Sequence, residues 1–186
     1  ANGLKDNCPE DEQNALFTLP DYIGKMVENK WLGSKTKQGF YKKIVDKEGK
    51  SQILSLNLKT LEYEEKQRVK FPTLEMTKSI DDLRARTKVL YNGKDKAGEF
   101  YQRSFNSLFA YVSHRIPEIA DELYKVDDAM RAGFGWELGP FESWDAVGVA
   151  EAVGKAKEEG IEIAPWIDEM LENGIKSFYI IEDGVK

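Results

Sequence analysis

The hydrophobic residues of this chain recur with helical spacing over most of its length. Within residues 95–116 the main apolar positions step by four, three, four and four residues, which places them on one face of a long helix. Residues 119–130 continue with steps of four, three and four and predict a second amphipathic helix. A further helix is predicted at about 79–92, and shorter ones begin at Pro20 and Pro165, because proline is tolerated in the first turn of a helix. The pattern predicts a mainly α fold.

One segment departs from this spacing. Between residues 39 and 64 the apolar residues stand on either side of the turn signal Asp46-Lys47-Glu48-Gly49, which predicts a small β-hairpin or three-stranded meander. A ribbon of this size needs another surface to pack against. Residues 65–77 are charged and contain Pro72, so they predict a linker, and residues 177–181 have the pattern of a last strand.

Two parts of the chain resemble each other at an offset of 144 residues. The segment Tyr22–Asn29 is echoed by Trp166–Asn173, and Phe40-Tyr41 is echoed by Phe178-Tyr179. Two amphipathic helices can be similar by chance, but the common register favours a duplication. That interpretation divides the chain into the tail of a first helical unit at 1–45, a strand-containing linker at 46–78 and a second helical unit at 79–186.

The composition is that of a folded globular protein with an acidic surface. Hydrophobic residues make up 41% of the 186 residues, and the formal net charge is −6. Phosphate contacts need clustered Lys and Arg, so this balance argues against nucleic acid as a partner. No apolar run approaches the roughly 20 residues that span a bilayer, so no transmembrane segment is predicted. Residues 1–12 are too polar for a signal peptide, and the single cysteine, Cys8, suits a reducing, cytoplasmic setting.

Residues 133–148, which we call the glycine-aromatic segment, contain the most distinctive pattern. Three of its glycines raise the possibility of a phosphate-binding loop, but a dinucleotide fingerprint follows a strand, and here a helix is predicted instead. A structural interpretation is favoured: Gly133 gives the preceding helix a left-handed stop, and the aromatic residues bury apolar area or face a partner domain. The residues expected to have structural or interface roles are Gly133, Gly135, Trp136, Gly139, Pro140, Phe141 and Trp144.

Other candidate residues for chemistry are few. His114 is the only histidine, so a zinc site of the usual kind is not predicted, and no metal ligands are assigned. The acidic residues at 118–128 are interpreted as the solvated face of a helix. Asn106 lies in or beside the apolar face of the long helix, where an amide either makes a local hydrogen bond or holds a substrate oxygen.

The glycine-aromatic segment resembles the signature of the C-terminal helical domain of 3-hydroxyacyl-CoA dehydrogenases. The Met-Gly-Pro-Phe-Glu-like core of that family corresponds to Leu138-Gly139-Pro140-Phe141-Glu142, and Val126–Met130 is similar to the stretch that precedes it. The segment Trp31–Tyr41 is similar to the one that closes the same domain. An end piece therefore precedes a whole copy at about 95–180, as in multifunctional fatty-acid oxidation enzymes with two such units. The resemblance implies a helical domain like the C-terminal domain of 6-phosphogluconate dehydrogenase.

The resemblance also implies a function, that of an NAD-dependent 3-hydroxyacyl-CoA dehydrogenase of fatty-acid β-oxidation. The family's His–Glu pair and its NAD fingerprint lie on a dinucleotide-binding domain that is not found in this sequence, so the chain alone is predicted to be inactive and to bind no cofactor. Its expected partners are that domain, an acyl-CoA substrate and a second copy in a homodimer. Asn106 matches a family Asn near the substrate, although a second copy usually stands in for a dimer partner. The basic stretch Lys35-Thr36-Lys37 is either a solvated turn or a contact for CoA phosphates.

Two alternatives to this function remain open at the level of sequence. The chain can be a non-catalytic interaction or dimerisation module, which dimer formation by the chain alone would favour. It can also be the helical domain of a different dehydrogenase, such as a sugar-acid enzyme, against which the Gly-Pro-Phe-Glu motif argues.

Overall fold

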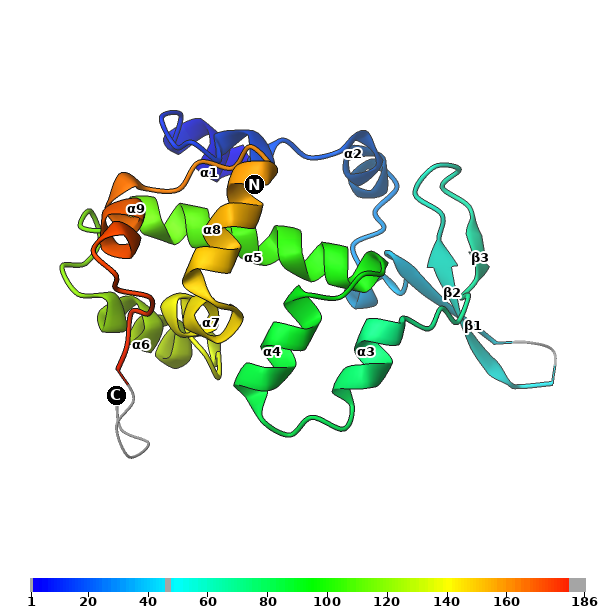
Figure 1. The fold of residues 1–186 in the computed structure, drawn as a ribbon. Coiled ribbons are helices and arrows are strands. Elements are labelled where there is room, and N and C mark those ends of the chain that lie inside the picture. Colours follow the sequence, from blue (N-terminus) through cyan, green and yellow to red (C-terminus); the bar gives the residue numbers. More distant parts are fainter. Residues whose placement is uncertain (1, 46–47, 181–186) are drawn as a thin grey trace. The chain divides into compact units, whose positions relative to one another are not determined.

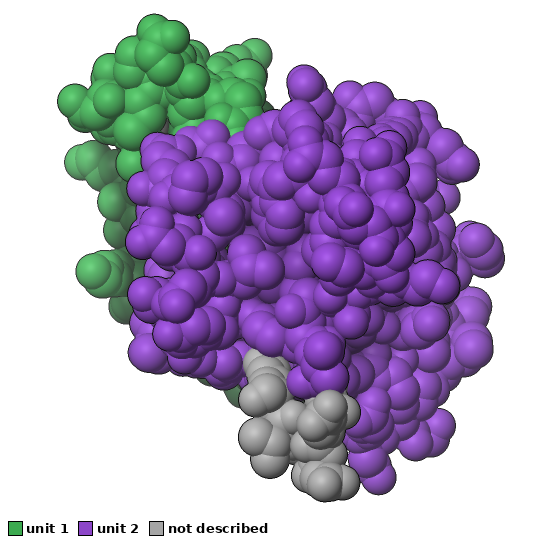
Figure 2. Space-filling view, turned by 60° about the vertical axis from the view of Figure 1, so that its left-hand side comes forward, with its two compact units in different colours: residues 1–69 green, residues 70–186 purple. Residues whose placement is uncertain are grey.

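The computed structural model describes residues 2–45 and 48–180, and the chain divides into two compact units. The first unit comprises residues 1–69 and the second residues 70–186. Figure 1 shows the helices and strands of the chain, and Figure 2 shows the two units in different colours. Each unit has its own core, so each is described by itself.

The first unit combines short helices with a three-stranded antiparallel sheet. Its elements are α1 (Asn2–Asn7), the 3₁₀ turn η1 (Asn14–Phe17), α2 (Asp21–Glu28), the 3₁₀ turn η2 (Ser34–Thr36), β1 (Tyr41–Val45), β2 (Ser51–Leu56) and β3 (Tyr63–Glu65). The strand order is β1-β2-β3, which confirms the predicted meander. Leu56 is buried on one face of this sheet, and the rings of Trp31 and Tyr63 meet edge to face at 5.6 Å. The core of this unit is therefore small.

Within the described residues 70–180 the second unit contains helices and no strand, and the mainly α prediction is confirmed. Its helices are α3 (Pro72–Thr77), α4 (Leu83–Tyr91), α5 (Lys96–His114), α6 (Leu123–Phe134), α7 (Pro140–Val147), α8 (Val149–Glu158) and α9 (Pro165–Glu172). Helix α7 packs against α4, α5, α6 and α8. Side chains from these helices form one buried cluster that includes Tyr91, Phe109, Phe141, Trp144 and Ile167.

Helix α5 begins at a carboxylate that serves two helices. The Oδ1 atom of Asp95 accepts hydrogen bonds from the backbone N–H groups of Ala97 and Gly98 at 3.1 and 3.0 Å, as an N-cap residue does. Its Oδ2 atom accepts the N–H of Thr73, in the first turn of α3, at 2.9 Å. These hydrogen bonds hold the pKa of Asp95 below its ordinary value, the one from Thr73 contributing most. One side chain thus joins α3 to the longest helix.

Four predictions of local structure were wrong. Residues 72–77 form α3 within the predicted linker, because Asp95 caps its first turn. Helix α6 begins at Leu123 rather than at residue 119. The left-handed residue that ends α6 is Gly135, not Gly133, with φ at 67°.

The fourth error concerns the predicted last strand. Residues 177–180 form no strand, because the N–H groups of Phe178 and Tyr179 are donated to the carboxylate of Asp145 instead of to a neighbouring strand. Ile181 lies outside the described residues.

Helices α2 and α9 end with the same hydrogen bonds at the offset seen in the sequence. The side-chain amides of Asn29 and Asn173 each donate to the carbonyl four residues earlier, both at 2.8 Å. The next residue is left-handed in both cases, Lys30 with φ at 58° and Gly174 with φ at 78°. The residue after that donates its N–H to the carbonyl of Met26 or Met170. This structural likeness adds to the likeness of sequence between the two segments.

Candidate functional site

Helix α7 starts within the glycine-aromatic segment, and its first turn is capped by a side chain from another helix. Gly139 is the N-cap residue and has no side chain of its own. Asp127 of α6 takes that place: its Oδ1 accepts the N–H of Phe141 at 2.9 Å, and its Oδ2 accepts the N–H of Glu142 at 3.1 Å. Pro140 needs no partner because it has no N–H. The free N–H groups of this helix end are thereby satisfied.

The glycine at position 139 is required by the closeness of Asp127. A Cβ atom on Gly139 would lie 2.4 Å from the Cα of Asp127 and 2.3 Å from its Oδ1. Any side chain at 139 would therefore push α6 and α7 apart. The Gly-Pro-Phe-Glu motif is explained physically by this contact, because it lets a remote carboxylate reach the helix end.

Glu142 completes the first turn of α7. Its Oε2 accepts the N–H of Gly139 at 2.7 Å, which is one half of a capping box. The guanidinium of Arg131 forms an ion pair with the same carboxylate, which is almost fully buried. Arg131 also bonds to Asp128. The negative charge of Glu142 is thus balanced, as a buried charge must be.

Two further residues fix the chain after α9 onto this site. The hydroxyl of Tyr179 donates to Oδ2 of Asp127 at 2.7 Å. Asp145 of α7 accepts the N–H groups of Phe178 and Tyr179 at 2.8 and 3.1 Å. Burial raises the pKa of Asp145, although these two N–H groups act in the opposite direction. Burial, followed by the bond to Asp127, raises the pKa of Tyr179, so its hydroxyl stays a donor at neutral pH.

The aromatic residues of the segment differ in their surroundings. Phe141 and Trp144 are completely buried, and the ring of Trp144 stacks on Phe109 with centroids 4.8 Å apart. Trp136 is 36% exposed and is not part of the buried cluster that contains the other two. The reason is that Gly135 turns the chain out of α6. Phe134, on the other side of that glycine, is 75% exposed.

The glycines of the segment do not fit a dinucleotide phosphate. A phosphate-binding loop offers free N–H groups at a helix N-terminus. Here the N–H groups of the first turn of α7 point at Asp127 and Glu142, so negative charge already occupies the position that a phosphate would need. Helix α6, not a strand, precedes the loop. These glycines therefore lack the free N–H groups of a dinucleotide-binding loop.

Asn106 is fully buried, and its amide joins three helices. Its Oδ1 accepts the hydroxyl of Tyr91 from α4 at 2.8 Å, and its Nδ2 donates to Oε2 of Glu159, at the end of α8, at 3.1 Å. Burial, followed by the charges of Glu151 and Glu159, raises the pKa of Tyr91, so the hydroxyl remains protonated. Lys155 lies over the ring of Tyr91 with its Nζ 4.4 Å from the centroid. Asn106 therefore sits under a charged surface formed by α8.

The remaining candidates lie apart from these groups. His114 is near the end of α5, with its Nε2 3.3 Å from the carbonyl oxygen of Glu162. Among the residues that the structure describes, no three His, Cys, Asp or Glu side chains are grouped as metal ligands would be. No described helix combines the length and the apolar character that crossing a bilayer requires.

Sequence reasoning missed Asp127. It was included with the solvated carboxylates of residues 118–128, and the prediction is right for Glu118 and Asp128, which are exposed, but wrong for Asp127, which is completely buried. A signal was present, because position 127 falls four residues after Leu123 and lies on the apolar face of the helix. An acidic residue on such a face indicates a buried partner.

The comparisons with known proteins concern the family of the chain. A protein of Bacillus subtilis (strain 168) with the name "Probable 3-hydroxyacyl-CoA dehydrogenase" is 40% identical over 184 residues, which are 99% of this chain and 23% of that protein. The resemblance to 3-hydroxyacyl-CoA dehydrogenases is confirmed. Proteins of Rickettsia felis and Rickettsia prowazekii, both provisionally named as a fatty acid oxidation complex trifunctional enzyme, are 26% and 25% identical over 132 residues.

The chain spans about a quarter of the first relative and less of the other two. The matched region is 71% of this chain but only 17% of each Rickettsia protein. No family model and no solved structure matches the chain.

Proposed function

We propose that this chain is part of an NAD-dependent 3-hydroxyacyl-CoA dehydrogenase of fatty-acid β-oxidation. The observation that carries the proposal is the 40% identity to the Bacillus subtilis protein over almost the entire chain. In this proposal NAD is bound by a dinucleotide-binding domain elsewhere in the enzyme, because the glycine-aromatic segment holds carboxylates where phosphates would bind. Cys8 is the single cysteine of the sequence and is exposed as a free thiol, which suits the reducing environment of the cytoplasm.

We further propose that the helical unit from about residue 79 covers an acyl-CoA and contacts neighbouring domains. Ligand pockets commonly form between domains, and a cover that excludes water strengthens the interactions inside. The exposed pair Phe134 and Trp136 is a suitable contact, because aromatic residues are enriched at protein interfaces. Residues 1–45 are proposed as the tail of a first unit, and the matching ends of α2 and α9 support this. The likeness to the C-terminal domain of 6-phosphogluconate dehydrogenase stays part of the same proposal.

Asn106 is given a positioning role in this proposal. Its amide is already bonded at both ends within the chain, and no part of the side chain is exposed. A substrate oxygen would have to displace Glu159 to reach it. We infer that Asn106 holds α4, α5 and α8 in place and affects the substrate only through them.

Activity measurements on the longer enzyme that contains this chain test the proposal. NADH formation from a 3-hydroxyacyl-CoA is expected for that enzyme and not for residues 1–186 alone. Calorimetric titration of residues 1–186 with NADH is expected to give no heat of binding. Dehydrogenase activity or tight NADH binding by the isolated chain would contradict the proposal.

The role of Asn106 is tested by two variants that break the same hydrogen bond. Asn106→Ala removes the acceptor, and Tyr91→Phe removes the donor. A positioning role predicts changes of kcat and KM in the same direction for both variants in the longer enzyme, and larger ones for Asn106→Ala because it also loses the hydrogen bond to Glu159. A direct contact with substrate predicts instead that Asn106→Ala lowers kcat/KM while Tyr91→Phe does not. That result would contradict the positioning role.

The second candidate function is a non-catalytic interaction or dimerisation module. The observation in its favour is the exposed aromatic pair Phe134 and Trp136 at the end of α6. Sedimentation of the isolated chain distinguishes the two functions. A dimer that dissociates in Trp136→Ala, without any binding of acyl-CoA, would favour the module.

A further inference from the structure

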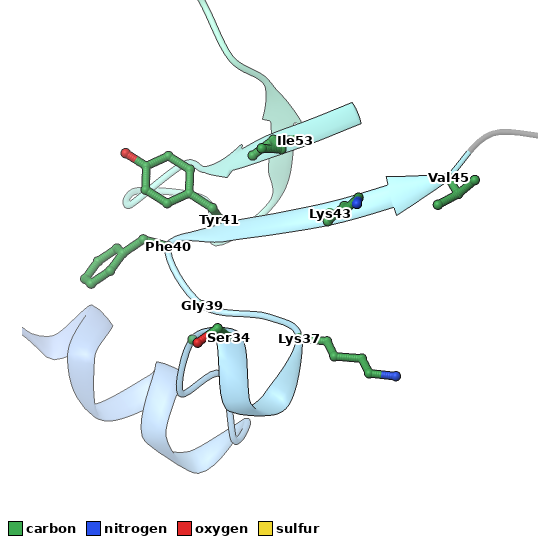
Figure 3. Close-up of a pocket in the computed structure, with 9 residues that line it drawn as sticks. Ser34, Lys37, Gly39, Phe40, Tyr41, Lys43, Val45 and Ile53 are labelled. Atoms are coloured by element: carbon green, nitrogen blue, oxygen red, sulfur yellow. The ribbon is translucent and has the colours of Figure 1, made fainter. Parts of the chain in front are cut away.

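A groove on the first unit lies between the loop at residues 33–39 and the strands β1 and β2. Its volume is about 750 Å³, which falls within the range of about 300–1,000 Å³ typical of small-molecule sites. Figure 3 shows the loop that carries Ser34 and Lys37 beside the strand that carries Tyr41, Lys43 and Val45, with the Lys37 side chain extending outward from the loop. The groove is formed within one unit, so its shape depends on that unit alone.

The strand side of the groove is apolar and open to solvent. Tyr41 and Val45 of β1 and Ile53 of β2 lie along it, and Ile53 is paired with Lys43 in the sheet. Together with Phe40, these residues are between 47% and 63% exposed. A cluster of large, exposed apolar side chains usually marks a binding site. The other face of the sheet is the one that packs inward, through Leu56.

The charge of the groove is opposite to that of the chain. Two lysines, Lys37 and Lys43, are among its lining residues, and within the described residues 2–45 and 48–180 no carboxylate lines it. The chain as a whole has a net charge of −6. Ser34 adds a hydroxyl on the loop side. The groove therefore combines an apolar floor with two positive side chains, Lys37 on the loop and Lys43 on the floor itself, which complements a ligand with a hydrocarbon part and an anionic part.

The loop that carries Lys37 is held rigidly. Gly33 and Gln38 exchange backbone hydrogen bonds of 2.8 and 3.1 Å, and a Cβ atom on Gly39 would lie 2.7 Å from the Cα of Gly33. Lys37 itself is left-handed, with φ at 60°. Glycine is relaxed in that conformation and lysine is strained, and such strain is often found at ligand-binding positions.

We propose that this groove binds the acyl-CoA thioester, with the acyl chain along Tyr41, Val45 and Ile53 and CoA phosphates at Lys37 and Lys43. The choice of a CoA thioester among amphipathic anions rests on the proposed function. The site is built from residues of the first unit, whereas the glycine-aromatic segment and Asn106 belong to the second. It would hold the substrate by its hydrocarbon and phosphate parts without taking part in the chemistry.

Calorimetric titration of residues 1–186 with decanoyl-CoA tests the proposal. Lys37→Gly and Lys43→Gln are each expected to weaken binding by roughly tenfold, as for the loss of one charge-assisted contact. Lys37→Gly also relieves the strained backbone, so a loss of binding cannot be attributed to unfolding. Ile53→Glu, which places a carboxylate on the apolar floor, is expected to abolish binding.

The matched control is Lys42→Gln. Lys42 is the neighbour of Lys43 on β1 but points to the other face of the sheet, where its Nζ lies 5.4 Å from the centre of the Tyr63 ring. This variant removes the same charge and is expected to bind decanoyl-CoA like the unmodified chain. Equal weakening by Lys42→Gln would mean that only overall charge matters, and it would overturn the proposed site.

Two simpler probes separate the parts of the ligand. Coenzyme A without an acyl group and free decanoate are each expected to bind at least tenfold more weakly than decanoyl-CoA, since each lacks one of the two contacts. Binding of either probe as tight as that of decanoyl-CoA would overturn the choice of ligand. Binding of decanoyl-CoA that none of the groove variants changes would overturn the groove while leaving the proposed function intact. If decanoyl-CoA does not bind at all, the groove is excluded, and activity of the longer enzyme decides the proposed function separately.

Discussion

Trp136 and Trp144 stand eight residues apart in the same segment but have different roles in the second unit. Trp144 lies in the centre of the aromatic cluster, between Phe109 and Phe178, with ring centroids 4.8 and 5.2 Å away. Trp136 follows the left-handed Gly135 and keeps a third of its surface in water. Burial, not residue type, therefore decides what each contributes to stability.

Replacing each tryptophan by alanine is expected to give different losses of stability. Trp144→Ala is expected to lower the free energy of unfolding by about 3–5 kcal/mol, as for other large core aromatics. Trp136→Ala is expected to lower it by about 2 kcal/mol less than Trp144→Ala does, because the exposed third of the Trp136 side chain stays in water in the folded chain. Urea unfolding followed by circular dichroism measures both. Equal losses would mean that Trp136 is buried in solution, for example in a dimer.

At the level of elements, helices were predicted correctly where the hydrophobic residues recur with helical spacing, because such spacing follows from burial of one helix face. The long helix α5 was predicted within two residues of its observed ends, and the meander β1-β2-β3 was found where alternation replaced helical spacing. Helix α3 was missed because its capping carboxylate, Asp95, stands 22 residues away. The apolar spacing of α6 indicates that Asp127 is buried, but its role as a cap was missed for the same reason, since it caps a helix that begins beyond the next loop. A pattern confined to one segment cannot reveal a partner that is brought close only by folding.

The ends of α2 and α9 allow a prediction about backbone strain. Lys30 is left-handed where Gly174 stands at the corresponding position. A left-handed residue with a side chain is strained by roughly 1–2 kcal/mol, and the greater freedom of unfolded glycine offsets part of the gain. Lys30→Gly is therefore expected to stabilise the first unit by up to about 1 kcal/mol.

The reverse change, Gly174→Lys, serves as the comparison and is expected to destabilise the second unit by about 1 kcal/mol. Differential scanning calorimetry measures both variants against the unmodified chain. A loss of stability in Lys30→Gly would show that the lysine side chain makes a contact that outweighs the strain.

Asp95 gives a pH dependence to the junction of α3 and α5. Its pKa in the folded chain is lower than its ordinary value of 3.8, chiefly because of the N–H of Thr73. A lowered pKa means that the folded state favours the carboxylate, so its contribution is fully present above the ordinary value. That contribution is lost as the pH falls from the ordinary value through the lowered one.

The variant Asp95→Asn is expected to lose this part of the acid sensitivity. Asparagine still caps a helix but does not titrate in this range. Unfolding in urea at several pH values, from about pH 6 to about pH 3, compares the two chains. The stability of the unmodified chain is expected to fall more steeply at the acidic end. Parallel curves would indicate that other carboxylates account for the whole effect.

At the scale of the whole molecule, the two units differ greatly in the apolar area that they bury. Met26 and Leu56 are the buried hydrophobic side chains among the described residues of the first unit. The second unit has a continuous cluster that runs from Tyr91 to Ile167. A small sheet with short helices is marginally stable by itself, whereas a helical unit with such a core folds independently.

Native-state hydrogen exchange should therefore distinguish the two units in the intact chain. Amides of β1, β2 and β3 are expected to exchange through openings of low free energy, while those of α5, α7 and α8 exchange only near global unfolding. Mass spectrometry of peptic peptides at increasing urea measures this, with residues 70–186 alone as the control. The isolated second unit is expected to keep the protection that it has in the intact chain. Equal protection of both units in the intact chain, lost from α5 when residues 1–69 are removed, would instead mean that they fold as one cooperative body. In that case the groove on the first unit would share the stability of the helical core, and ligand binding there would protect both units together.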